Sequence, residues 1–131
     1  MDIVKATWSP AFYGGDQSLA VGQKQRFAFF KQTPVYLAGY EGLIFYSGNI
    51  HPEWLREIEV IIVAITHPIL GRVKSVSNDD GFNYTITLTD GTRLCVDAEE
   101  NPGKLIRVEG QWSDAYSQIE DWTMQVDLQK A

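Results

Sequence analysis

The sequence predicts a single, mainly β domain whose antiparallel strands form a barrel or a sandwich. Apolar and polar residues alternate along several short segments, most clearly over residues 82–88, as they do when one face of a strand is buried. An Asp90-Gly91 pair separates that segment from a second alternating one, which is typical of a hairpin. About nine or ten such segments recur at the spacing of barrels and sandwiches, and 131 residues match the size of one domain, 1–131.

Several strands are predicted in the first half of the chain. Residues 4–8 alternate apolar with polar side chains, and residues 26–30 form a second β-prone segment. Pro34 is placed at a strand start or a sheet edge, where no ladder hydrogen bond is lost. Residues 35–38 and 43–46 are apolar and flank two glycines, which predicts a hairpin or a sharp bend.

One short helix is predicted near residues 52–58. A proline and a glutamate suit its first turn, and Trp54, Leu55 and Ile58 recur at helical spacing. The β-branched run at residues 59–65 predicts a strand buried on both faces, although the same run could extend the helix.

A meander of antiparallel strands is predicted over residues 70–112. Val73 and Val76 have opposite parity in the alternation, so a β-bulge is expected between them. The Asp90-Gly91 turn is predicted as type I′, in which both residues have positive φ. The side chains expected to face the core are Phe82, Tyr84, Ile86 and Leu88. The same alternation with polar residues continues at Leu94, Val96 and Ala98 and then at Ile106, Val108, Gly110 and Trp112.

This order of strands resembles the meander of small barrels of the OB or SH3 type. The resemblance is carried by Gly71-Arg72-Val73, the expected bulge, the Asp90-Gly91 hairpin and the return strand. It implies a small-barrel-like fold and no particular function, because unrelated activities share such folds. A closing strand is predicted where Trp122, Met124, Val126 and Leu128 alternate with polar residues.

Charge and cysteine content limit the functional classes. The formal net charge is −6, and residues 51–131 hold seven Lys or Arg against fourteen Asp or Glu. Such acidity disfavours non-specific nucleic-acid binding. One cysteine, no signal-peptide pattern and no long apolar stretch predict a cytoplasmic protein that does not enter a membrane.

Catalytic and metal signatures are weak. His51 and His67 both precede prolines, and nothing in their spacing requires a metal, so they are interpreted as turn residues. Cys95 has no local catalytic signature and is interpreted as an incidental thiol. Residues 13–16 lack the lysine of a phosphate-binding loop. We therefore expect no catalytic residues, no metal and no cofactor.

A partner-binding surface is the functional feature that the sequence favours. Carboxylates fall in expected turns and mix with aromatic residues, which supply interface anchors while charge supplies steering. Tyr116, in a polar stretch, is expected to be a surface anchor, whereas Trp112 and Trp122 are expected in the core. The candidate binding residues are Asp79, Asp80, Glu99, Glu100, Asp114, Tyr116, Glu120 and Asp121.

These features predict a small, acidic, non-enzymatic protein-binding inhibitor. A bacterial toxin-immunity protein or a phage anti-defence protein would fit, because acidic side chains can occupy the cationic groove of a nuclease. The partner would carry a basic surface. Two alternatives remain: a β-barrel that binds a small molecule or an oligonucleotide, and, with least support, an enzyme with a dispersed carboxylate site.

Overall fold

Strand β5 (Arg56–His67) organises the molecule because it pairs with neighbours along both of its edges. The computed structural model describes residues 3–8, 18–37, 52–78, 82–97, 100–101, 103–119 and 123–131. The other strands are β1 (Ile3–Trp8), β2 (Leu19–Ala20), β3 (Lys24–Phe30), β4 (Thr33–Leu37), β6 (Gly71–Asn78), β7 (Asn83–Leu88), β8 (Arg93–Asp97), β9 (Leu105–Glu109) and β10 (Met124–Lys130). Two 3₁₀ turns, η2 (Pro52–Trp54) and η3 (Asp114–Gln118), complete the described elements.

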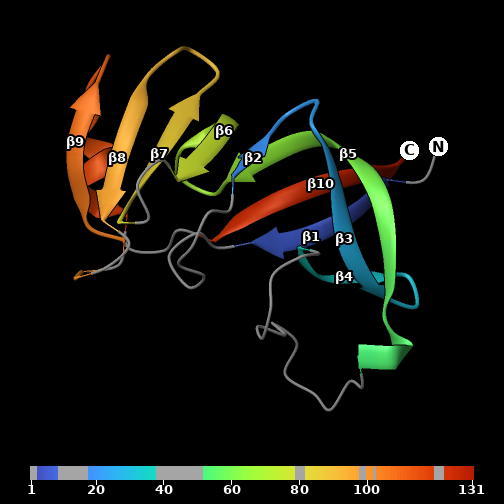
Figure 1. Ribbon diagram of the computed structural model, residues 1–131. Coiled ribbons are helices and arrows are strands. Elements are labelled where there is room, and N and C mark those ends of the chain that lie inside the picture. Colours follow the sequence, from blue (N-terminus) through green and yellow to red (C-terminus); the bar gives the residue numbers. More distant parts are fainter. Residues whose placement is uncertain are drawn as a thin grey trace.

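The strands form one antiparallel sheet with two regions that share β5 (Figure 1). In one region, β4 pairs with β3, and β3 pairs with the first half of β5. The other edge of β5 pairs with β10, which in turn pairs with β1. In the other region, the end of β5 leads into the meander β6, β7, β8 and β9. The expectation of a mainly β, antiparallel fold is therefore confirmed.

The short strand β2 connects the two regions. It pairs with β6, and the turn after it donates from Gly22 N to Ile62 O of β5 at 2.7 Å. Val21 N donates in the same way to Lys74 O of β6 at 3.0 Å. Strands β1 and β4 approach each other, but no pairing joins them among the described residues. The sheet is open there, so its closure into a barrel stays a prediction.

The core follows the predicted alternation in most strands. Tyr84, Ile86 and Leu88 of β7 are buried, as are Leu94 and Val96 of β8. The expected bulge is confirmed by a register shift between Val73 and Ser75 against β7. The remaining buried apolar residues of this cluster are Ala6, Trp8, Leu19, Phe27, Phe29, Val60, Ile62, Ile65, Val73, Val76, Tyr116, Ile119, Met124, Val126 and Leu128.

The predicted helix near residues 52–58 is wrong. Only the single 3₁₀ turn η2 forms, and β5 begins at Arg56, so Ile58 lies in a strand and packs against the core. The β-branched run that follows favours extended backbone, and pairing of β5 with β3 and β10 outweighs the short helical pattern. Pro34 lies on β4, which among the described strands pairs only with β3, as expected for an edge strand.

Three details of the predicted meander are also corrected. Phe82 precedes β7 and is 55% exposed, so it does not face the core. A register shift between Cys95 and Val96 places Leu105 opposite Val96 and leaves Ile106 exposed. The hairpin after β7 is confirmed, but its turn type is not I′. Only Gly91 has positive φ there, and Gly91 N donates to Leu88 O, the pattern of a three-residue loop ending in a G1 bulge.

Some predictions cannot be compared with the structure. The hairpin expected around residues 38–46, together with Ala98 and Trp122, lies outside the described residues. Among the residues that are described, no helix has the length and apolar character needed to cross a membrane.

Candidate functional site

The predicted partner-binding residues are only partly placed by the structure. Glu100 and Asp114 are exposed, as a binding role requires. Asp79, Asp80, Glu99, Glu120 and Asp121 lie outside the described residues. Their role therefore stays a prediction.

The expectation that Tyr116 is a surface anchor is wrong. Tyr116 is 8% exposed and belongs to the same core cluster as Ile119. Both residues come from the η3 segment, where a 3₁₀ turn aligns side chains three residues apart on one side. Ser113 caps this turn, because its Oγ accepts a hydrogen bond from Ala115 N at 3.3 Å. The turn thus directs the tyrosine inward.

The expectation that Trp112 lies in the core is also wrong, because its side chain is 57% exposed. The chain leaves β9 at Gly110, whose φ of +120° interrupts the strand alternation before Trp112 is reached. The indole packs edge-on against Tyr116, with ring centroids 5.6 Å apart and planes at 86°. An exposed tryptophan is therefore supported by a buried tyrosine beneath it.

Trp54 is a second exposed tryptophan, in the other region of the sheet. It is 51% exposed on η2, and its ring centroid lies 6.3 Å from that of Phe30. The Lys31 ammonium lies 5.4 Å from the Phe30 ring centroid, within the range of a cation–π contact. With Leu55, Phe30 covers the fully buried Ala28 of β3 in a small satellite cluster.

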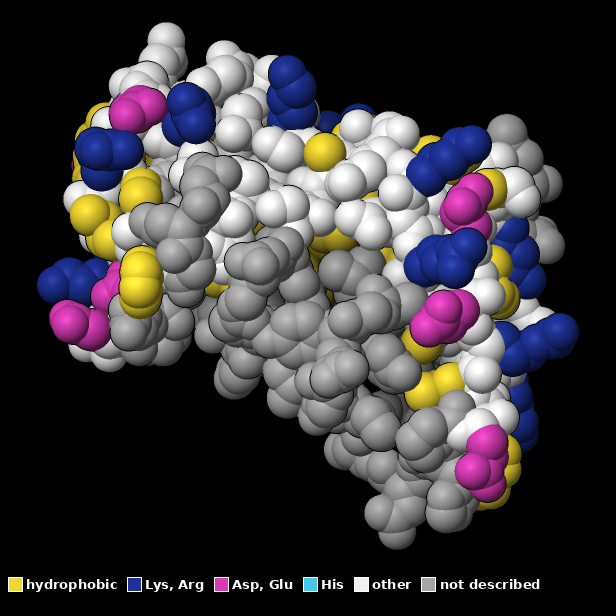
Figure 2. Space-filling view, viewed as in Figure 1, with side chains coloured by type: hydrophobic (Ala, Val, Ile, Leu, Met, Phe, Trp, Pro, Cys, Tyr) yellow, Lys and Arg dark blue, Asp and Glu magenta, His cyan; other side chains and the backbone are white. Residues whose placement is uncertain are grey.

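The described surface carries charged side chains of both signs. On the face seen in Figure 2, cations and carboxylates are interspersed, and no large patch of one sign forms among the described side chains.

In the β7–β8 loop, Thr92 donates its backbone N–H to Asp90 Oδ1 at 2.8 Å. This hydrogen bond and a side-chain hydrogen bond from Thr92 lower the pKa of the Asp90 carboxyl.

His67 has a structural role that agrees with its interpretation as a turn residue. It is 1% exposed, and its Nδ1 accepts hydrogen bonds from Ile69 N and Leu70 N, both at 3.1 Å. The imidazole thereby satisfies two backbone donors of the turn between β5 and β6. His51 lies outside the described residues. Within the described ranges, no three His, Cys, Asp or Glu side chains are grouped closely enough to hold a metal ion.

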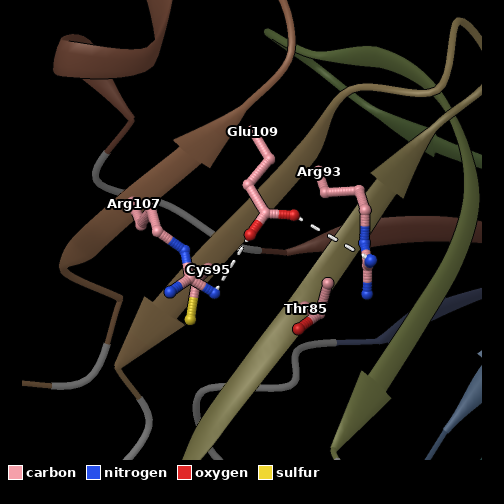
Figure 3. A pocket seen from close by; sticks show the side chains of 5 residues that line it. All are labelled: Thr85, Arg93, Cys95, Arg107 and Glu109. Carbon is pink, nitrogen blue, oxygen red and sulfur yellow. Dashed lines mark ion pairs between the residues drawn. The ribbon is translucent and has the colours of Figure 1, made fainter.

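A polar depression on the outer face of the meander was not predicted as a site. It has a volume of about 170 Å³ and is lined by five residues of β7, β8 and β9: Thr85, Arg93, Cys95, Arg107 and Glu109 (Figure 3). The two guanidinium groups flank Glu109. Arg107 Nη2 lies 3.3 Å from Glu109 Oε1, and Arg93 Nη1 lies 3.9 Å from Glu109 Oε2. All three charged side chains are at least half exposed.

Sequence reasoning missed this grouping, although part of its signal was present. Cys95 and Arg93 lie two residues apart on β8, so the alternation along a strand puts them on the same face. Arg107 and Glu109 join them only through the register of β9, which depends on the shift between Cys95 and Val96.

A search of protein-family models, curated proteins and solved structures finds no significant match to this chain.

Proposed function

We propose that this chain is a cytoplasmic, non-enzymatic protein-binding inhibitor that captures a partner with a basic surface, as a toxin-immunity or phage anti-defence protein would. The observation that carries the proposal is the exposed, supported Trp112. Tryptophan is enriched among the few residues that dominate binding free energy at protein interfaces. Its position in a stretch that mixes aromatic and acidic residues joins an anchor to a charged rim.

The geometry of Trp112 favours binding over simple solvation. The edge-on contact with Tyr116 and the capped η3 turn restrict the indole before any partner arrives. Less side-chain entropy is then lost on association, and more of the contact energy appears as affinity. Trp112 replaces Tyr116 as the aromatic anchor, and Tyr116 becomes the residue that supports it.

Carboxylates around this anchor would steer the partner. Asp114 is exposed in the turn beside Trp112, and Glu120 and Asp121 follow within a few residues of the chain. Exposed charge increases the association rate with an oppositely charged surface, and salt screens the effect over about 8 Å at physiological ionic strength. The remaining acidic residues of the proposal are Asp79, Asp80, Glu99 and Glu100.

The oligonucleotide-binding alternative has less support. A base-stacking pocket needs aromatic rings on its surface, and none of the five residues lining the meander depression is aromatic.

Binding kinetics test the proposal with a basic protein that co-purifies from the native host. We expect Trp112→Ala to raise the dissociation rate by about tenfold or more, as for an interface anchor. Trp54→Ala is the matched control, because Trp54 is almost equally exposed on the distant η2 turn and should leave the rate unchanged.

Charge reversal tests the steering part separately. Reversing Asp79, Asp80, Glu99 and Glu100 together should slow association at low salt and have little effect at high salt. Parent-like kinetics of both Trp112→Ala and the charge reversal would overturn the proposal. Recovery of a metabolite as the only ligand would also overturn it.

A further inference from the structure

The outer face of the meander carries two rows of polar side chains that cross its strands. Strand register places Ser75, Thr87, Arg93 and Glu109 side by side in one row. Ser77, Thr85, Cys95 and Arg107 form the neighbouring row by the same pairings. Both rows begin with hydroxyl groups on β6 and β7, and each carries one guanidinium group farther along, that of Arg93 on β8 in the first row and that of Arg107 on β9 in the second.

The depression lies where these rows meet. Figure 3 shows the guanidinium groups of Arg93 and Arg107 on its two sides, Glu109 between them at one end, and Thr85 and Cys95 toward the other. Thr85 and Cys95 are half-buried on neighbouring strands, so the floor is narrow and fixed by the sheet. Its volume of about 170 Å³ suits a small polar group better than a whole nucleotide.

The charges in the depression do not balance. Two guanidinium groups face one carboxylate, and each guanidinium has five N–H donors in a planar fork that matches an oxyanion. The Arg93–Glu109 separation of 3.9 Å exceeds hydrogen-bond length, so that ion pair is loose. Exposed ion pairs contribute little free energy, and Glu109 is therefore easily displaced by a stronger acceptor.

The side chains that line the depression are polar. The depression itself has no apolar wall, because its lining consists of one hydroxyl, one thiol and three charged side chains. Recognition there must depend on charge and hydrogen bonds, which favours a compact ligand with several oxygen acceptors.

We propose that this depression is a binding site for a small phosphate-type oxyanion, either free phosphate or the phosphate of a small phosphomonoester. Arg93 and Arg107 donate to its oxygens from two sides, Thr85 donates from the floor, and Glu109 turns away from the bound anion. The site lies on β7, β8 and β9 and goes beyond the proposed capture of a protein through Trp112.

Nuclear magnetic resonance of the isotope-labelled full chain tests this site directly. Inorganic phosphate and glycerol phosphate are titrated separately at constant ionic strength, with acetate as the reference anion. We expect saturable shifts of the Thr85, Cys95 and Arg107 amides with a phosphate compound and none with acetate. The tighter of the two phosphate compounds identifies the source of the ligand.

Two variants are expected to change the affinity for phosphate in opposite directions. Arg107→Gln should weaken phosphate binding by about tenfold, the value of a charged hydrogen-bonding group. Glu109→Gln should strengthen it about two- to fivefold, because the competing carboxylate is removed. Arg26→Gln on β3 is the matched control, since Arg26 is also exposed and lies opposite a glutamate, Glu59. All three positions are exposed, so the variants should fold normally.

Several results would overturn the site. One is the absence of saturable shifts with either phosphate compound. Another is an equal loss of binding in Arg26→Gln and Arg107→Gln, which would indicate diffuse attraction. Weaker binding by Glu109→Gln would show that the carboxylate supports the ligand instead of competing with it. Shifts produced by a single-stranded oligonucleotide alone would assign the face to nucleic acid and refute the small-ligand site.

Discussion

Replacing Ile86 by alanine tests the alternation on which the fold rests. Ile86 is 0% exposed, and its cross-strand partners Val76 and Leu94 are 0% exposed as well. The change removes three buried carbon atoms, each worth about 0.8 kcal/mol in transfer free energy. The cavity left between three strands adds to this loss, so the free energy of unfolding should fall by about 3–4 kcal/mol, within the usual range of about 2–5.

Urea denaturation followed by tryptophan fluorescence measures this loss. The midpoint should decrease while the slope of free energy against urea stays constant, because the same surface unfolds. Phe82→Ala is the comparison: Phe82 is larger than isoleucine but 55% exposed, so its loss should cost about 1 kcal/mol or less. The assignment of Ile86 to the core and Phe82 to the surface would be refuted by either of two results: a loss of unfolding free energy below about 1 kcal/mol for Ile86→Ala, or a greater loss for Phe82→Ala than for Ile86→Ala.

Further substitutions test individual contacts. His67→Ala should destabilise the fold by about 3 kcal/mol in thermal unfolding, because it opens a cavity and leaves two turn N–H groups without their acceptor. Gly110→Ala should cost more in urea denaturation than Gly91→Ala, because both have positive φ but only at Gly110 does a Cβ meet backbone, 3.0 Å from Thr92 Cα. Asp90 has a pKa lowered below 3.8 by its hydrogen bonds, so its stabilisation is present above that pH and is lost as pH falls through the folded-state pKa. Asp90→Ala should therefore show a shallower loss of stability in acid, measured as urea midpoints over a pH series.

The candidate sites were only partly predictable from the sequence. The stretch beginning at Trp112 was identified as a mixture of aromatic and acidic residues, which is a property of local composition. Polar neighbours around Tyr116 suggested that this ring is exposed, whereas the 3₁₀ turn directs it inward and leaves Trp112 exposed. The Arg93–Arg107 depression was missed because its residues are distant in sequence and meet only through strand register.

Local alternation was enough to determine the strands and the core faces of β7 and β8, because a period of two is set by backbone geometry within each strand. It also located the bulge between Val73 and Ser75. Only the tertiary structure decided how β5 divides its edges among β3, β6 and β10, and where β9 shifts against β8. Those pairings depend on hydrogen bonds between distant segments, and a shift of one residue reverses which side chains reach the surface.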